Sequence, residues 1–390
     1  VYRGRPELLA VSVVLVETAS YRQPLLMELE DFESGAKVHA LVDETADHHS
    51  VRVQALPLRM PVLFAFGAMA ATGSSLLTQY DPLHWSADGL SFQAGDWIAI
   101  DLPALIADSA LDEAVSLVYR PAANEGTFLF SASSGASGIG ATQTGFLLVV
   151  LRDLYQRVSS FSRGINGMWQ ERVLIPEAAV GLGIPGYGDP LSKSAVVSAE
   201  SFVIPRQSML VGDDGATVPV MARSRSAEVS AVPRIRRQFA IADDGARIPY
   251  YLVAEPAADA KEGLRPVLMS GYGGFGVPIS PAYRDLVAGA IHRKWLNAGG
   301  IYVLAAARGG GEYGPSWYQA GRAIKRQRSY DDYQIVAQHL IASGVTEAGR
   351  IGWIGASNAG LTAGVLATQR ADLFGAAVAL VPVLDMGGCR

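Results

Sequence analysis

The chain has 390 residues, a formal net charge of −5, 49% hydrophobic residues and 18% charged residues. This composition supports large hydrophobic cores and is unlike that of a disordered chain. The acidic balance offers no basic surface for binding nucleic acid. A single cysteine, Cys389, excludes an internal disulfide framework and a cysteine-based metal cluster.

The longest apolar run lies near residues 60–71 and is too short for a membrane span, which takes about 20 residues. We therefore expect a buried strand there and no membrane insertion. Residue 1 is Val rather than Met, so we expect that the natural start is missing. The compartment, cytoplasmic or periplasmic, and the oligomeric state are left open.

Residues 1–236 consist of short apolar runs separated by Gly, Asp, Ser and Pro, without long helical periodicity. Such runs predict a many-stranded antiparallel β structure, and they leave open whether it is a sandwich, a barrel or a propeller. The runs that most clearly predict strands are 8–17, 37–44, 50–57, 96–103, 114–121, 126–133, 145–153 and 208–215.

From residue 237 the pattern changes. Residues 237–256 predict a hairpin with Asp244-Gly245 at its turn. Predicted strands and helices then alternate, which indicates a mostly parallel sheet wrapped by helices. The strands are expected at 265–270, 301–307, 350–354 and 375–385, and the helices at 282–298, 329–343 and 358–370. The chain is thus predicted to divide into 1–236 and 237–390.

Two local signals refine the helices. The helix over 282–298 is expected to end at Gly299-Gly300. For the helix over 329–343, Ser329 is predicted to cap the start and Asp332 to complete a capping box. The buried stripe of this second helix is predicted to be Tyr333, Val336, Ala337, Leu340 and Ile341.

The segment GASNAG, 355–360, places Ser357 between a predicted strand and a predicted helix. A serine on such a corner stands exposed at the carboxyl edge of the sheet, as a hydrolase nucleophile must. Ala359 stands where the G-x-S-x-G pattern has its second glycine. The competing interpretation is a small-residue helix start with an idle serine.

A nucleophile of this kind needs an oxyanion hole. The backbone N–H of Asn358 is one candidate donor, and the loop SGYGGFG, 270–276, offers the hydroxyl of Tyr272 as the second. The competing interpretation of this loop is a glycine-rich turn. It has no P-loop lysine, so we set nucleotide binding aside.

The sequence contains no general base in the expected order. The histidines are His39, His48, His49, His84, His292 and His339, and all precede Ser357. Hydrolases of this architecture place the acid and the histidine after the serine. His339 is expected on the outer face of its helix. Either the chain is incomplete or Ser357 is not catalytic.

Residues 237–390 resemble the catalytic domain of the prolyl oligopeptidase family of serine peptidases. The motifs that carry the resemblance are GYGGF (271–275), RGGGEYG (308–314), SYDDY (329–333), GASNAG (355–360), QRADLFGA (369–376) and VPVLDM (381–386). The segments 96–105 and 201–215 resemble the family's propeller more loosely. The resemblance implies a partial α/β-hydrolase domain preceded by a partial, all-β propeller.

The resemblance also implies roles for single residues. Ser357 matches the nucleophile, and Tyr272 matches the oxyanion tyrosine that acts with the Asn358 amide. Phe275, Asn358 and Val383 match positions that line a proline-sized pocket, while RGGGEYG is interpreted as structural. The family's Asp and His are expected beyond residue 390, so this chain alone is predicted to be inactive. No metal and no cofactor are implied.

The predicted function is hydrolysis of short peptides after proline through an acyl-enzyme. Three alternatives remain. The first is cleavage after basic residues, as in oligopeptidase B relatives. The second is an acylaminoacyl peptidase or esterase of the same fold. The third is a non-catalytic relative that only binds, which the absence of a histidine after Ser357 favours.

Overall fold

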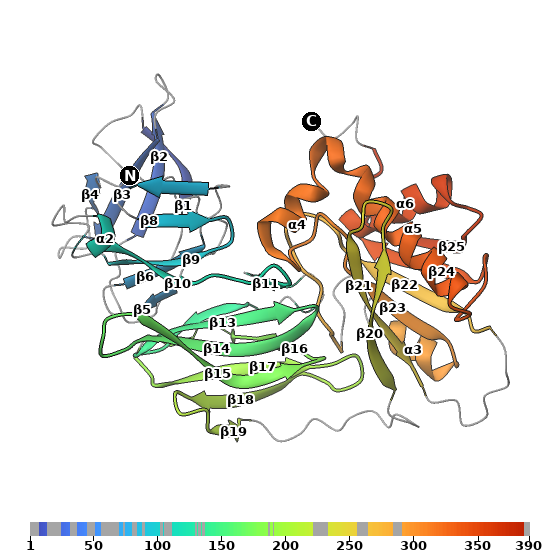
Figure 1. The fold of residues 1–390 in the computed structure, drawn as a ribbon, viewed down its shortest axis with the longest axis horizontal. Coiled ribbons are helices and arrows are strands. Elements are labelled where there is room, and N and C mark those ends of the chain that lie inside the picture. The colour runs from blue at the N-terminus through green and yellow to red at the C-terminus, as the bar shows by residue number, and fades with distance from the viewer. Residues whose placement is uncertain are drawn as a thin grey trace.

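The computed structural model describes in full residues 77, 91–101, 104, 113–128, 131, 134, 137–185, 188, 189, 191–220, 233–255, 264–283 and 291–385, together with the backbones of residues 111–112 and of the strands between residues 8 and 90. Four antiparallel sheets lie on one side, and a mixed sheet with its helices lies on the other (Figure 1). Within the described residues, none of the helices has the length and apolar character needed to cross a bilayer.

The first part of the chain forms its four sheets one after another, each from strands that are close in sequence. A separate hairpin of β7 and β8 lies between β6 and β9 in the chain, and β12 pairs with β13. The strands are β1 (Leu8–Val13), β2 (Leu25–Asp31), β3 (Lys37–Glu44), β4 (Val51–Ala55), β5 (Ala70–Thr72), β6 (Ser75–Gln79), β7 (His84–Ala87), β8 (Leu90–Gln93), β9 (Trp97–Asp101), β10 (Val115–Tyr119), β11 (Glu125–Thr127), β12 (Ile139–Ala141), β13 (Gly145–Arg152), β14 (Tyr155–Arg163), β15 (Trp169–Ala178), β16 (Gly181–Gly183), β17 (Ser194–Glu200), β18 (Gln207–Gly212) and β19 (Thr217–Pro219). A short helix, α2 (Leu111–Ala114), precedes β10.

Strand β13 explains how these sheets pack. Its sequence, GFLLVVLR, is apolar on both faces, and all but the last residue are buried. Phe146, Leu148 and Val150 enter a core shared with the sheet of β5, β6, β9 and β10. The alternate residues Leu147, Val149 and Leu151 enter a second core with the sheet of β16–β19. Consecutive antiparallel sheets of four or five strands, stacked face to face, are the blades of a β-propeller.

The second part is a six-stranded sheet in the order β20-β21-β23-β22-β24-β25. Strands β20, β21 and β23 pair antiparallel, and the remaining pairs are parallel. The strands are β20 (Arg234–Ile241), β21 (Arg247–Ala254), β22 (Val267–Gly271), β23 (Ile301–Ala305), β24 (Ile351–Ala356) and β25 (Phe374–Leu380). The helices are α3 (Ile291–Asn297), α4 (Gly314–Ala320), the 3₁₀ turn η2 (Ala323–Lys325), α5 (Gln327–Ala342) and α6 (Asn358–Gln369).

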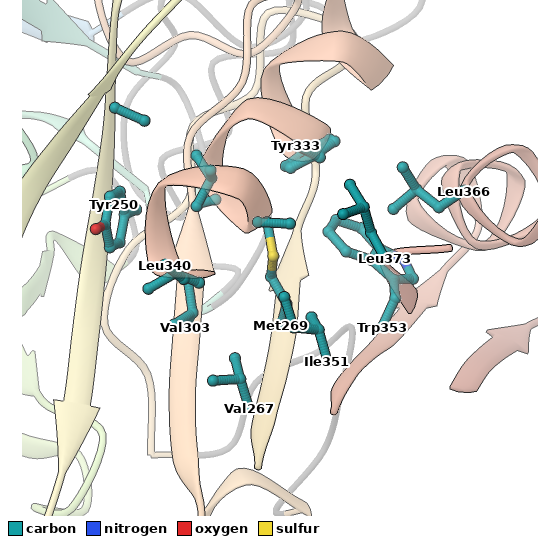
Figure 2. Packing of buried hydrophobic residues seen from close by; sticks show 14 of the residues in the cluster. Tyr250, Val267, Met269, Val303, Tyr333, Leu340, Ile351, Trp353, Leu366 and Leu373 are labelled. Carbon is teal, nitrogen blue, oxygen red and sulfur yellow. The ribbon is translucent and has the colours of Figure 1, made fainter. Parts of the chain in front are cut away.

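One face of this sheet is covered by α5 and α6. Figure 2 shows the core between this face of the sheet and the two helices, in which Trp353 of β24 lies beside Tyr333 of α5. Their ring centroids are 4.6 Å apart in an edge-on arrangement, a favourable geometry for aromatic pairs. The stripe predicted for α5 is confirmed, with Tyr333, Val336, Ala337 and Leu340 buried and Ile341 partly buried against the core.

The other face of the sheet packs against α3 and the propeller sheets. Alternate residues of β21 and β23, such as Tyr251 and Tyr302, point to this side. They form one core with Leu154 and Phe202 of the first part of the chain. The hydroxyl of Tyr251 donates to the carbonyl of Leu154. The sheet is therefore held between its own helices on one side and the propeller on the other.

Most predicted elements are present, with shifted ends. Gly245 has a positive φ of 82° at the turn between β20 and β21, as the hairpin requires. Gly299, with φ of 85°, ends α3, and residues 284–290 of the predicted helix lie outside the described part. The predicted strand over 375–385 ends at Leu380. Strand β20 begins at Arg234, before the predicted start of the hairpin at residue 237. The division of the chain at residues 236 and 237 stays a prediction.

The predictions for three residues of α5 are wrong. The helix begins at Gln327, so Ser329 lies inside it, where its hydroxyl bonds the carbonyl of Arg308. Asp332 also binds Arg308, with its Oδ1 2.6 Å from Nη2, instead of completing a capping box. His339 is not on the outer face, since its Nδ1 lies 2.9 Å from the Tyr250 hydroxyl. These tertiary partners outweighed the local signals.

The predicted strand at 60–71 lies mostly outside the described residues.

Candidate active site

Ser357 occupies the corner between β24 and α6. Its φ of 54° and ψ of −118° are unusual for a residue with a side chain and mark stored backbone strain of the kind found at functional sites. The surroundings hold this conformation in place. The Ser357 N–H donates to the carbonyl of Leu380 over 3.0 Å, and its own carbonyl accepts from the N–H groups of Gly360 and Leu361.

Small residues allow this corner to close. A methyl group added at Gly355 would lie 2.6 Å from the Cβ of Ala359, which is far inside van der Waals contact. Ala359 is fully buried, and its carbonyl accepts a hydrogen bond of 3.0 Å from the Trp353 indole. The departure of Ala359 from the glycine pattern is thus accommodated, because Gly355 leaves room for the extra methyl.

The loop after β22 brings Tyr272 to Ser357. The side chains of Tyr272 and Ser357 lie close enough to interact. Burial raises the pKa of Tyr272, while the interaction with Ser357 and the charge of Arg326 lower it, and the balance lies above the usual value. The hydroxyl therefore stays protonated at neutral pH and can donate a hydrogen bond to a developing anion.

Asn358 takes part in the site through its backbone N–H and through its side-chain amide. Its backbone N–H is in the first turn of α6, where N–H groups have no acceptor within the helix. Its side chain is buried and fixed at both ends. Nδ2 donates to the Tyr272 carbonyl over 2.6 Å, and Oδ1 accepts from Arg326 over 2.8 Å.

The other two predicted pocket residues are more exposed. Phe275 has a positive φ of 58° and is 70% exposed, with its ring centroid 6.5 Å from that of Tyr272. Val383 is 38% exposed. It follows Pro382, whose Cα lies 3.0 Å from the position of a Cβ at Gly360, so its segment runs along the first turns of α6. Roles in a pocket stay predictions for Phe275, Asn358 and Val383.

Sequence reasoning missed Arg326. It lies directly before α5 in the stretch AIKRQR, where no motif distinguishes it from the neighbouring cations. The fold brings its guanidinium to Gly273, Asn358 and Tyr330, on three separate elements. Only the tertiary structure could reveal this role, since the partners lie up to 53 residues away.

The RGGGEYG loop, predicted to be structural, is held by buried polar contacts. Arg308 binds Asp332 of α5 and Asp244 of the β20–β21 turn. Glu312 is fully buried and accepts a 3.0 Å hydrogen bond from the Ile279 N–H. Burial raises the pKa of Glu312 to about 7. These contacts tie the loop to the sheet and to α5.

The histidines whose side chains the structure describes are engaged elsewhere. Nε2 of His292 lies 3.0 Å from the Phe202 carbonyl, and His339 contacts Tyr250. The other four histidines lie where side chains are not described. In the part of the chain with described side chains, no group of three or more His, Cys, Asp or Glu residues could hold a metal ion.

A strained serine on a strand–helix corner, in a mostly parallel sheet joined to a β-propeller, defines an α/β-hydrolase fold with a propeller. Solved structures share this fold. The post-proline cleaving enzyme from Rickettsia typhi is 23% identical with a TM-score of 0.75, and the match covers 93% of this chain and 49% of that one.

Sequence comparison then identifies the family. The profile of the Prolyl oligopeptidase family matches residues 290–389. An uncharacterized peptidase, y4nA, of Sinorhizobium fredii is 39% identical over 306 residues, covering 77% of this chain and 39% of that protein. The prolyl endopeptidase of Dictyostelium discoideum is 36% identical over 146 residues, covering 37% of this chain and 18% of that protein. The chain is a member of the prolyl oligopeptidase family, and it spans about 39% of the length of its y4nA relative.

Proposed function

We propose that this chain belongs to a serine peptidase that hydrolyses short peptides after proline through an acyl-enzyme. The observation that carries the proposal is the strained corner at Ser357, with the side chain of Tyr272 close enough to interact with it. A serine held in that backbone conformation, beside a hydrogen-bond donor and a helix N-terminus, suits nucleophilic attack on a carbonyl.

The chemistry follows from these groups. Ser357 Oγ forms a bond to the peptide carbonyl carbon and gives up its proton to a general base, and the carbonyl oxygen becomes an oxyanion. The Tyr272 hydroxyl and the Asn358 N–H donate to that oxyanion. Collapse of the oxyanion breaks the carbon–nitrogen bond, and the base returns the proton to the leaving amine. Water then hydrolyses the ester, which releases the acid and restores Ser357. The proposal assigns no base among the described residues, because His292 and His339 are engaged elsewhere.

The proposed preference for proline rests on the character of the residues near Ser357. Phe275 and Val383 are apolar and keep exposed surface, so they offer a proline side chain an uncharged environment. Names of relatives favour the same preference, since two of them are a prolyl endopeptidase and a post-proline cleaving enzyme. A carboxylate would be the expected partner for a basic substrate side chain, and none of the residues proposed for the pocket carries one.

The test uses the protein as its gene encodes it, treated with a fluorophosphonate probe and then assayed on three matched substrates. These are a peptide amide with proline before the cleaved bond, the same peptide with arginine there, and an ester. We expect labelling of the wild type, no labelling of Ser357→Ala, and a preference for the proline amide. Ser343→Ala, at the exposed end of α5, serves as the control and should label normally.

Other outcomes would contradict the proposal. Equal labelling of Ser357→Ala and wild type would exclude Ser357 as the nucleophile. A preference for the arginine peptide would leave the nucleophile but replace the specificity with that of an oligopeptidase B relative. Hydrolysis of the ester alone would indicate an esterase, and an unlabelled wild type would favour a non-catalytic relative.

A further inference from the structure

Arg326 connects the two halves of the proposed oxyanion hole. Its Nη1 donates to the Gly273 carbonyl in the loop that carries Tyr272. Its Nη2 donates over 2.8 Å to Oδ1 of Asn358, the residue after the nucleophile. The planar guanidinium therefore bridges the loop after β22 and the start of α6, which are neighbours only in the folded chain.

This bridge fixes the direction of the Asn358 side-chain amide. An arginine can only donate hydrogen bonds, so the amide must turn its oxygen toward Arg326. The Nδ2 group then faces the Tyr272 carbonyl, to which it donates over 2.6 Å. A carbonyl can only accept, so both partners require the same orientation. The Tyr272 backbone is thereby tied to the residue beside Ser357.

Arg326 is itself held in place. Its Nε lies 3.2 Å from the Tyr330 hydroxyl, its Nη1 lies 3.2 Å from Ser329 Oγ, and the guanidinium lies 4.9 Å from the centre of the Tyr330 ring. Both partners are one turn along α5 and are buried. With several contacts to rigid groups, the side chain is well placed to transmit a fixed geometry.

The position of Arg326 is poor for helix stability. It is the residue directly before α5, where the partial positive charge of the helix dipole favours an anion. A cation there is therefore better explained by its tertiary partners than by the helix. The same charge lowers the pKa of Tyr272, which means that it favours negative charge near that hydroxyl.

We propose that Arg326 is the positioning residue of the oxyanion hole, holding the Tyr272 loop and the Asn358 amide in register around Ser357. This inference rests on the proposed function. Arg326 does not touch the reacting atoms. It acts through Asn358 and Gly273, and a small displacement of an oxyanion donor is sufficient to slow acyl transfer strongly.

The test compares Arg326→Met, Arg326→Lys and the control Lys325→Met in the protein as its gene encodes it. Lys325 is the exposed cation one residue earlier. We expect Arg326→Met to lower kcat roughly 10- to 100-fold with KM changed less than about threefold. Arg326→Lys should recover part of kcat, since it keeps the charge but cannot span both acceptors. Lys325→Met should match the wild type.

A kcat for Arg326→Met within twofold of the control would overturn the proposal. So would a loss of kcat that Arg326→Lys does not relieve although it restores the melting temperature, because that pattern means a purely structural role. If the wild type itself is inactive, the proposed function fails separately. Crystal structures of the wild type and Arg326→Met then decide. An unchanged Asn358–Tyr272 contact overturns the positioning role, and a rotated amide supports it.

Discussion

The Nδ2 group of Asn358 donates a hydrogen bond of 2.6 Å to the backbone carbonyl of Tyr272. These residues are 86 positions apart, and the bond joins the loop after β22 to the corner between β24 and α6. The Tyr272 side chain in turn lies close enough to Ser357 to interact with it. The candidate nucleophile and its two candidate oxyanion donors are therefore one connected unit.

Removing the Tyr272 hydroxyl is predicted to slow chemistry without weakening substrate binding. Tyr272→Phe should lower kcat roughly 100- to 1,000-fold with little change in KM, because the oxyanion forms only during the reaction. Steady-state kinetics on a proline peptide measure this. Tyr250→Phe is the control, since that hydroxyl bonds Gln238 and His339 away from Ser357. Equal losses in both variants would argue against an oxyanion role.

Gly355 and Gly352 lie on the same strand and are predicted to respond in opposite ways to alanine. Gly355→Ala places a methyl 2.6 Å from the Cβ of Ala359, so overpacking should destabilise the protein by about 1–3 kcal/mol and slow Ser357 labelling. At Gly352 the nearest atom would be 3.8 Å away, so Gly352→Ala should be neutral or slightly stabilising. Chemical denaturation measures both. Tolerance at 355 would mean that the corner is less tightly packed than described.

The buried carboxyl of Glu312 is predicted to make stability depend on pH. Its pKa is raised by burial from 4.5 to about 7. Between these values the folded state keeps a proton that the unfolded state releases. Its contribution to stability is therefore fully present below about pH 4.5 and is lost as the pH rises through about 7.

Glu312→Gln is the test of this dependence. Glutamine keeps an oxygen acceptor for the Ile279 N–H but cannot ionise. The wild type should lose up to about 1.4 kcal/mol of unfolding free energy per pH unit relative to the variant across that window. Denaturation curves at pH 4.5 to 8 measure the difference between the two proteins, in which other titrating groups cancel. Parallel curves would show that the carboxyl does not titrate there.

The core shared by the propeller and the hydrolase sheet is predicted to make the two parts unfold together. Phe202 is 1% exposed and packs edge-on against Tyr251 and Tyr302, with ring centroids 5.5 Å and 5.8 Å apart. Phe202→Ala should destabilise the protein by about 3–5 kcal/mol. Ile204→Ala, two residues later and 49% exposed, should change stability by less than about 0.5 kcal/mol. Calorimetry measures both, and a wild type that melts in two separate transitions would contradict a shared core.

Much of the fold was predictable from local pattern. The apolar runs of the first part gave strands such as β13, since an eight-residue run without polar alternation fits a strand buried on both faces. The sequence could not tell a sandwich from a propeller, because both need such strands. The pairing of Phe146 with one core and Leu147 with another depends on which sheets lie on each side.

In the second part, the alternation of strands and helices and the corner at Ser357 were determined by the sequence itself. The spacing of apolar residues and the glycines at turns act within a few residues, so they can be read along the chain. The start of α5 was mispredicted for the converse reason. Ser329 and Asp332 look like capping residues locally, but Arg308, more than twenty positions away, binds them both.

The tertiary structure alone decided how the candidate site is held together. Arg326 resembles its neighbouring cations in sequence, and the side chain of Asn358 gives no sign of its two partners. Their roles come from loops brought together by a sheet whose strands are not in chain order. Hydrogen bonds between such loops depend on distances set by the whole core, and no local pattern in a sequence encodes them.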